Sequence, residues 1–415
     1  MKIGKYSFGI GDRFGQQGFF QIKALMDASK EIGIEIVPVW NKSNREHSIV
    51  HSSPEDVRKE ANEAVKKIGY QGQYFVDADH INLNNVEKFI SSSDFFTIDV
   101  ADYIGKIATE EDIKNFIENN KKYIGSLYIP GIDKPFIVTE SLLKEIANKY
   151  LFAIKEAYNI YNFIVSKKGN ENFVAEVSMD EVNDPQTPVE MFFILSAIAH
   201  YNIPAQTIAP KFTGRFNKGV DYVGDIQQFE KEFEEDILVI KYCIKEFGLP
   251  ENLKLSVHSG SDKFSLYPII GKLIKKYNTG VHIKTAGTTW LEEVIGLAMS
   301  GGEALEMAKK IYREAYKRRE ELCAPYATVI DIDPLALPHP DEVDKWDSNL
   351  FANTLRHDVE NKYFNPNFRQ LIHVGYKVAA ENIDKYIELI NKNSTIVGQQ
   401  VYENIYLRHI KRLFK

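Results

Sequence analysis

Cysteine is scarce in this sequence, and long apolar runs are absent. Cys243 and Cys323 are the only cysteines in the 415-residue chain, and neither has the spacing of a metal-binding motif. We therefore expect idle thiols in a reducing compartment rather than a disulfide framework. No apolar run approaches the roughly 18 residues that span a bilayer, and the amino terminus lacks the apolar core of a signal peptide. These absences predict a cytoplasmic protein without a membrane partner.

An excess of basic charge is also absent. The chain has 51 Lys and Arg against 58 Asp and Glu, a net charge of −7, with the two signs interspersed. This distribution argues against a nucleic-acid partner. The chain is 44% apolar with 25 Gly and 15 Pro, so it is neither disordered nor fibrous and can bury a large core. The expected partner is a small molecule, and the sequence leaves a homo-oligomer open.

Short strand-like segments alternate with helical patterns along most of the chain. The helical patterns include Gly18–Ile32, Ser53–Ile68, Pro188–His200 and Asp225–Phe247. The strand-like segments are residues 6–11, 34–39, 73–78, 94–99, 173–178, 205–210, 254–259 and 281–285. Eight alternations predict an α/β protein with a (β/α)8 TIM-type barrel over residues 1–302, and a doubly wound open sheet is the alternative.

Two regions depart from this alternation. After strand four, a helix near 109–121, a hairpin over Tyr123–Thr139 and a long helix near 140–167 predict an insertion at about 103–150. We expect the insertion to stand over the barrel mouth. Residues 303–415 are helical and charged and are broken by the proline-rich loop Asp331–Asp341. They predict a carboxy-terminal helical extension packed on the barrel.

Polar residues alternate with apolar ones in the last two strand segments. Ser256 and His258 share one face of the seventh strand, and His282 and Lys284 share one face of the eighth. Both strands then break into Gly/Ser/Thr loops at their carboxyl ends, where parallel barrels carry their active sites. The pattern therefore predicts an active-site rim with polar side chains pointing inward.

Acidic residues gather at the ends of the third and fourth strands. Asp77 and Asp79 point to the same side, His80 follows at the rim, and Asp99 ends the next strand. Burial would penalise such a cluster anywhere but in a functional site. Helix capping by the aspartates is the structural alternative, but it explains one acid better than three.

Glu176 lies deep within the fifth strand, so its charge needs a cation or an ion-pair partner. A structural ion pair with Lys211 or Lys284 is one alternative. The other is a divalent metal held by His80 and His258 with one carboxylate, a mixed nitrogen and oxygen set that keeps positions open for substrate. No compact metal motif is present, so the metal hypothesis depends on the placement of these residues at strand ends.

Eight motifs occur in the order found in one known family and extend from about residue 3 to the end of the chain. They are Gly9–Gly15, Asp77–His80, Phe96–Asp99, Glu176–Glu181, Lys218–Asp225, Ser256–Phe264, His282–Gly287 and Arg369–Val374. On these motifs the sequence resembles the tagaturonate epimerase family. The resemblance implies a metal-dependent enzyme of hexuronate catabolism that interconverts D-tagaturonate and D-fructuronate.

The resemblance also implies roles for individual residues. Asp79 is expected to accept a proton and Glu176 to donate one. His80 and His258 are expected to bind a divalent metal, with Asp221 as the favoured remaining ligand. Zinc, manganese, nickel, cobalt and iron all suit such a site, and the sequence does not distinguish among them.

Three features depart from the family pattern. Tyr103 stands where the family has histidine, Gly375 stands where it has threonine, and the chain begins almost at its first strand, where family members carry an extension. The metal and proton-transfer positions are unchanged. Substrate preference is therefore the property in question, and the uncharged ketohexoses fructose and tagatose are alternative substrates.

The chemistry of such an epimerisation favours retro-aldol cleavage. The inverted carbon is β to the ketone, so the carbonyl does not acidify its hydrogen. A base instead takes the hydroxyl proton at that carbon, the adjacent C–C bond breaks to an enediolate that the cation stabilises, and the bond reforms on the other face of the aldehyde. Transient oxidation would need a nicotinamide, and no Gly-x-Gly-x-x-Gly motif with a downstream acid follows a strand. A class II aldolase is the rival enzyme class, and a sugar-binding protein without turnover is the non-enzymatic one.

Several residues are expected to contact the substrate. The loops Ser259–Asp262 and Thr285–Thr288 are expected to bind its carboxylate through backbone N–H groups, although such turns also simply begin helices. A neutral ketohexose would place its hydroxymethyl group there. The expected substrate-binding side chains are Asp12, Arg13, Asp99, Lys211, His282, Lys284 and His373.

Overall fold

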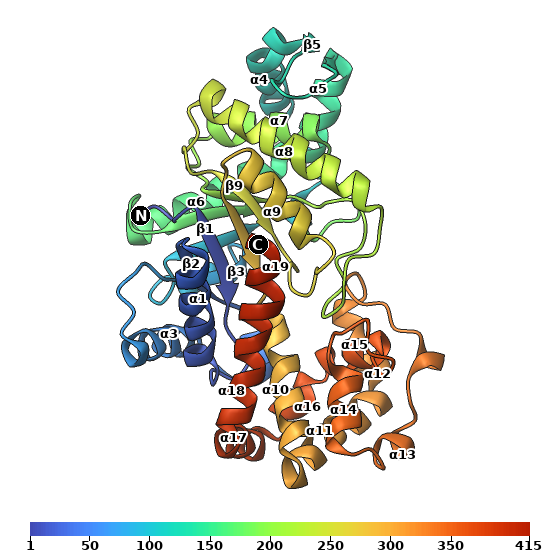
Figure 1. The fold of residues 1–415 in the computed structure, drawn as a ribbon. Coiled ribbons are helices and arrows are strands. Elements are labelled where there is room, and N and C mark those ends of the chain that lie inside the picture. Colours follow the sequence, from blue (N-terminus) through green and yellow to red (C-terminus); the bar gives the residue numbers. More distant parts are fainter.

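Eight parallel strands close into a barrel in the computed structural model, which describes residues 1–415 (Figure 1). The strands follow one another around the barrel in the order β1-β10-β9-β8-β7-β4-β3-β2. Their bounds are β1 (Tyr6–Ile10), β2 (Ile36–Ser43), β3 (Phe75–Ile81), β4 (Phe95–Asp99), β7 (Val174–Ser178), β8 (Thr207–Ala209), β9 (Lys254–Val257) and β10 (Val281–Lys284). The predicted (β/α)8 barrel is confirmed, and the open sheet is excluded because β1 pairs with both β2 and β10.

Strands β2 and β3 reach farther toward the mouth than the sequence indicated. We expected them to end at residues 39 and 78, but they end at Ser43 and Ile81. Lys42 and Ser43 pair with Ala78 and Asp79 in the extra part of the ladder. The residues at these ends are mostly polar, so they lack the apolar alternation by which strands are recognised in a sequence.

Helices cover the outside of the barrel. They are α1 (Gly18–Ile32), α3 (Pro54–Ile68), α6 (Phe152–Lys168), α7 (Pro188–His200), α8 (Ile226–Phe247), α9 (Tyr267–Lys276) and α10 (Ala286–Ser300), and the 3-10 turn η1 (Val86–Phe89) connects β3 to β4. The four helical patterns recognised in the sequence are confirmed to within a residue. The short helix α2 (Asn44–Val50) was not predicted, although a capping box between Ser43 and Glu46 starts it. No helix combines the length and apolar character needed to cross a bilayer.

The insertion after β4 lies away from the barrel mouth, so our expectation that it stands over the mouth is wrong. It contains η2 (Ala101–Tyr103), α4 (Glu110–Asn120), η3 (Lys121–Tyr123), the hairpin β5 (Gly125–Leu127) and β6 (Phe136–Val138), α5 (Glu140–Ile146) and the π-helical turn η4 (Ala147–Leu151). The helices α5 and α6 are continuous through η4, and α4 and η4 pack on α7. Figure 1 accordingly shows α4 and α5 beyond α7, opposite the carboxy-terminal helices.

The carboxy-terminal extension forms a second helical body beside the mouth. Its helices are α11 (Gly302–Lys317), α12 (Arg319–Cys323), α13 (Pro340–Val343), α14 (Ser348–Leu355), α15 (Pro366–Val374), α16 (Tyr376–Ala380) and α17 (Ile383–Lys392), with 3-10 turns η5 (Ala324–Tyr326) and η6 (Pro334–Ala336). With α10 these elements enclose an apolar cluster separate from the barrel core. The extension therefore has its own core and meets the barrel at the carboxyl ends of the strands.

The last helix returns along the barrel wall. The elements α18 (Ser394–Glu403), η7 (Asn404–Ile410) and α19 (Lys411–Phe414) are continuous and pack on α10, α1 and α9 (Figure 1). The ring of Phe414 lies 5.0 Å from that of Tyr6, and the ring of His409 lies 6.1 Å from that of Phe8. The carboxyl terminus of the chain therefore covers the outer face of β1, the first strand of the barrel.

We predict that Phe414→Ala lowers the free energy of unfolding by about 3–5 kcal/mol, because it opens a cavity between this helix and β1. Leu407→Ala is the matched control on the same helix: Leu407 is 44% exposed, whereas Phe414 is 6% exposed. The control should change stability by no more than about 0.5 kcal/mol. Urea denaturation followed by circular dichroism measures both values, and equal losses would contradict the packing described here.

Candidate active site

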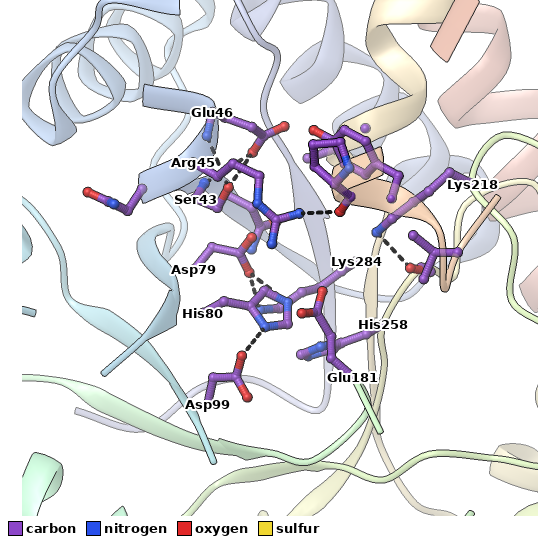
Figure 2. A pocket seen from close by; sticks show the side chains of 18 of the residues that line it. Ser43, Arg45, Glu46, Asp79, His80, Asp99, Glu181, Lys218, His258 and Lys284 are labelled. Carbon is purple, nitrogen blue, oxygen red and sulfur yellow. Dashed lines mark hydrogen bonds and ion pairs between the residues drawn. The ribbon is translucent and has the colours of Figure 1, made fainter. Parts of the chain in front are cut away.

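A polar cavity of about 660 Å³ opens at the carboxyl ends of the barrel strands (Figure 2). Strands β2, β3 and β4 line one side, and the loops after β8, β9 and β10 line the other. The carboxy-terminal extension closes over it with Pro325, Tyr326, Thr328, Val329 and His373. The cavity thus has the position in which barrel enzymes bind their substrates.

Lys284 on β10 lies at the centre of the polar residues beneath this cavity. Its Nζ is 2.8 Å from Oδ2 of Asp77, 2.8 Å from Oδ1 of Asp79 and 3.1 Å from Oε1 of Glu176. The lysine also donates to the hydroxyl of Thr97. One ammonium therefore contacts carboxylates from both β3 and β7, on the far side of the barrel. The ion pair between Glu176 and Lys284 that the sequence left open is present.

The three carboxyl groups around Lys284 differ in their pKa values. Burial alone would raise the pKa of Asp79, but the Lys284 ammonium holds it at about 2. Burial likewise opposes ionisation of Glu176, yet Lys284 and His258 keep its pKa well below the usual value. Burial raises the pKa of Asp77 to about 6 in spite of Lys284. Near neutral pH, Asp79 and Glu176 are therefore carboxylates, and Asp77 is the group that protonates first.

Two histidines stand beside this lysine, each in contact with carboxylates. His80 Nδ1 is 3.1 Å from Oδ2 of Asp99. His258 Nε2 is 2.7 Å from Oε1 of Glu176, and its Nδ1 is 2.9 Å from Oδ1 of Asp180. The two imidazole rings lie 5.1 Å apart. Figure 2 shows His80 and His258 facing each other across the base of the cavity, with Lys284 next to them.

The backbone at His80 explains how this ring reaches the site. His80 has φ +52°, a left-handed conformation that costs energy in a residue with a side chain. The pairing of β3 with β4 shifts its register between Ala78 and Ile81, and His80 lies within that irregularity. A bulge of this kind turns a side chain out of the strand alternation. The shift thus brings His80 to the rim beside Asp79.

The two histidines and neighbouring acids have the composition of a divalent metal site. Ligand atoms of His80, Asp180 and His258 all lie within 4.8 Å of one another, and so do those of His80, Asp99 and Glu181. Nitrogen and carboxylate oxygen donors together suit zinc and the neighbouring transition metals. The buried Oε2 of Glu176 has no hydrogen-bond partner, so an acceptor oxygen remains free next to the first group. The residues present therefore fit a cation.

Asp221, which we favoured as the remaining metal ligand, does not join the histidines. Its carboxylate accepts hydrogen bonds from the backbone N–H of Tyr222 and from both the N–H and the hydroxyl of Ser265. It therefore ties two loops together. Asp180 occupies the position beside His258 instead. Glu176, Ser178 and Asp180 are spaced two residues apart, as are side chains on one face of a strand. The sequence therefore already indicated that Asp180 points inward.

Three of the other expected substrate-binding residues line the cavity. They are Arg13, Asp99 and His373. Arg13 pairs with Glu46 and stacks its guanidinium 3.9 Å above the ring of Tyr376. Burial, then the charges of Arg13 and Lys218, keep the pKa of His373 well below its usual value. The sequence did not assign roles to Lys218, Arg45 or Glu181, which also line the cavity.

The remaining expected contacts lie outside the cavity wall. In the turn after β1, Asp12 accepts hydrogen bonds from the backbone N–H groups of Phe14, Gln16 and Gln17, and so shapes that turn. The N–H of Lys211 donates to Gln186, and its side chain does not reach the cavity. His282 is buried on β10 with Nδ1 2.9 Å from the hydroxyl of Ser7, and burial lowers its pKa to about 3. Asp12 and His282 thus have structural partners, and none of these three side chains lines the cavity.

The fold and the site together define a barrel enzyme with carboxylates, a lysine and two histidines at the base of a polar cavity. A model of the tagaturonate epimerase family (UxaE) matches residues 1–414. This chain belongs to the tagaturonate epimerase family. It is an isomerase, an epimerase that acts on sugar acids.

Individual relatives agree with this membership. A tagaturonate/fructuronate epimerase from Thermotoga maritima is 29% identical over 425 residues, which cover 98% of this chain and 79% of that protein. The glycerol complex of the fructuronate-tagaturonate epimerase UxaE from Cohnella laeviribosi is 24% identical and superposes with a TM-score of 0.80, covering 100% of this chain and 82% of that one. The native structure of the same protein gives a TM-score of 0.77 with the same coverage. These crystal structures share the fold described above.

We predict that Lys284→Met lowers the free energy of unfolding by about 3–5 kcal/mol at neutral pH, because it leaves buried carboxylates without their counter-charge. Lys276→Met is the control, since Lys276 pairs with Glu234 on the surface. Solvent screens that surface pair, so its loss should change stability far less than the loss of Lys284. Chemical denaturation measures both variants, and a small loss for Lys284→Met would mean that the charge balance at the barrel centre matters little.

Proposed function

We propose that this protein interconverts D-tagaturonate and D-fructuronate with the help of a divalent cation. One observation carries the proposal: two groups of residues meet at one cavity. The first is His80, Asp180 and His258, and the second is Lys284 with Asp79 and Glu176. Membership in the family supports the substrate pair, which is also the pair named for the Thermotoga maritima relative.

The hydrogen-bond partners of the histidines suggest which nitrogens would hold the cation. Nδ1 of His80 is engaged by Asp99, so Nε2 is the nitrogen without such a partner. Nε2 of His258 is engaged by Glu176 and its Nδ1 by Asp180, and because Asp180 adjoins both histidines a cation would lie between Nδ1 and Asp180. Carboxylates that accept a hydrogen bond from the other nitrogen of a ligating histidine fix its orientation. Asp99 and Glu176 would serve in this way, and His80, His258 and Asp180 would be the ligands.

We predict that Asp180→Asn and His258→Ala lose the bound metal, whereas Asp221→Asn keeps it. The reason is that Asp180 adjoins both histidines and Asp221 is engaged with Ser265. The purified variants are equilibrated with each candidate ion, and their metal content is measured by mass spectrometry. The result shows whether Asp180 or Asp221 is the carboxylate ligand. If Asp180→Asn kept its metal and Asp221→Asn lost it, the ligands would be His80, His258 and Asp221, as expected from the sequence.

The reaction is proposed to proceed by cleavage and re-formation of one C–C bond. Asp79, an ionised carboxylate that lines the cavity, accepts the hydroxyl proton at the inverted carbon. The bond to the neighbouring carbon then breaks, its electron pair remains as an enediolate, and the inverted carbon becomes an aldehyde. The aldehyde turns its other face before the bond re-forms. A bound divalent cation supplies Lewis-acid stabilisation of the negative oxygen atoms.

Glu176 is proposed to serve the opposite proton transfer, although it does not line the cavity. Because it is ionised at rest, it donates a proton only after receiving one. Lys284 Nζ contacts both Asp79 and Glu176, at 2.8 and 3.1 Å, so the ammonium connects the two carboxylates. The proton that Asp79 takes from the substrate can therefore be relayed through Lys284 to Glu176 without passing through solvent. Glu176 then holds the proton needed when the bond re-forms. This connection gives Lys284 a part in the proton transfer in addition to its structural one.

We predict that Asp79→Asn lowers kcat by ~10²-fold or more, the usual contribution of a general base. Asparagine has nearly the same shape but accepts no proton, so metal content and thermal stability should stay close to those of the wild type. Steady-state kinetics on tagaturonate, with metal analysis of the same preparation, measures the effect. If the metal-bound variant turned over normally, Asp77 or Asp99 would become the candidate base.

The function itself is tested by product analysis. The metal-loaded protein is incubated separately with tagaturonate, fructuronate, fructose and tagatose, and the products are resolved by chromatography. Interconversion of the two uronates is the expected result. Conversion of only fructose and tagatose would make the neutral ketohexoses the substrates. Accumulation of free three-carbon fragments would identify a class II aldolase, and binding without turnover would identify a sugar-binding protein.

A further inference from the structure

Four cationic side chains line the cavity, and they differ in their partners. Lys284 is surrounded by three carboxylates, and Arg13 pairs with Glu46. Arg45 and Lys218 have no carboxylate oxygen within 4.0 Å. Lys218 is the less exposed of the two, and its Nζ donates to the hydroxyl of Ser259 at 2.8 Å. Figure 2 shows Lys218 entering the cavity from the side opposite to Asp79, His80 and Asp99. Lys218 is therefore a positive charge without a counter-ion at the wall facing the acids.

The first turn of α10 forms part of the same wall. Ala286, Gly287 and Thr288 line the cavity, and no side chain caps this 15-residue helix. Uncapped N–H groups at a helix amino terminus bind anions. A β-carbon at Gly287 would lie 3.3 Å from Nε2 of His373 and 3.7 Å from a guanidinium nitrogen of Arg13. Glycine thus leaves room for a ligand between the helix, His373 and Arg13.

His373 provides a second, independent indication of a ligand. It is only 2% exposed, it lines the cavity, and its Nδ1 has no hydrogen-bond partner. A buried polar atom without a partner is costly unless a ligand or water completes it. His373 also lies 3.6 Å from a β-carbon placed on Gly219, the residue after Lys218. Lys218, His373 and the start of α10 therefore surround one region of the cavity.

We propose that Lys218, His373 and the amino terminus of α10 form a carboxylate-binding subsite that holds the acid end of the substrate. The inference rests on the proposed function and deepens it. Lys218, and not Lys284, is the cation that recognises the carboxylate, because the charge of Lys284 is already balanced by Asp77, Asp79 and Glu176.

Such a subsite has a particular use in a cleavage mechanism. When the C–C bond breaks, the six-carbon acid divides into a three-carbon enediolate and a three-carbon aldehyde that carries the carboxylate. The aldehyde must turn over and yet remain in the cavity until the bond re-forms. An anchor on its carboxylate, which one carbon separates from the reacting carbon, leaves the bond to the aldehyde group free to rotate and prevents escape. The same anchor would separate an epimerase from an aldolase that releases its fragments.

The test compares Lys218→Met with Lys218→Arg and Arg45→Met on charged and neutral substrates. For each protein, KM is measured for tagaturonate and for tagatose, or an inhibition constant where tagatose is not turned over. Lys218→Met should raise the tagaturonate value about 10–100-fold, since it removes a charge-assisted hydrogen bond, and should leave the tagatose value nearly unchanged. Lys218→Arg should recover most of the loss. Release of free dihydroxyacetone per turnover should increase in Lys218→Met and remain negligible in the wild type.

Several outcomes would overturn the proposal. Equal losses on tagaturonate and tagatose would mean that Lys218 does not recognise the carboxylate. A selective loss in Arg45→Met but not in Lys218→Met would place the carboxylate at the other end of the cavity. Unchanged fragment release would refute retention of the aldehyde. A wild-type protein without uronate turnover would instead refute the proposed function, so the two failures are distinguishable.

Discussion

The charge balance around Lys284 is the constraint on which the site depends. Three carboxylates from β3 and β7 lie inside the barrel, and a single ammonium from β10 contacts all of them. Without that cation, burial would raise their pKa values and leave neutral acids in place of bases. The interaction also joins strands on opposite sides of the barrel. Structural and chemical roles therefore cannot be separated at this residue.

The histidines extend the same network outward to the rim. Glu176 contacts both Lys284 and His258, so the buried charge group and the group of potential metal ligands share one carboxylate. His80 joins them only because the β3 backbone is irregular there. Asp79, which contacts Lys284 and lies 3.8 Å from Nε2 of His80, links the two groups on the other side. The site is thus one connected set of charges, which explains why its members have such different pKa values.

The carboxy-terminal extension contributes at two distant places. Its middle part closes the cavity with His373 and the segment from Pro325 to Val329, and its last helix covers β1 on the barrel wall. Arg369 connects the middle part to the barrel, since it is fully buried and donates to Asp262, to the carbonyl of Gly219 and to the carbonyl of Leu355. Glycine 219 adjoins Lys218, so this buried arginine also fixes the loop that forms the proposed carboxylate subsite.

The sequence predicted the barrel and the inward face of its strands because both depend on local periodicity. Glu176, His258 and Lys284 alternate with apolar residues on short strands, which is sufficient to place them inside. It could not place Asp221 or Lys211, because their loops are oriented by contacts with Ser265 and Gln186 far away in sequence. The role of Lys284 depends on three partners from other strands, and the position of the insertion depends on the packing of α4 and η4 against α7. Neither is encoded in a local pattern.

The central claim is that the site inverts a carbon by breaking a C–C bond and not by removing its hydrogen. Running the epimerisation of tagaturonate in deuterium oxide and examining the product by NMR tests this claim most directly. The account predicts that the inverted carbon keeps its original hydrogen, because only its hydroxyl proton is transferred to Asp79 before the bond breaks. Deuterium at the inverted carbon would show direct proton abstraction and would contradict the account.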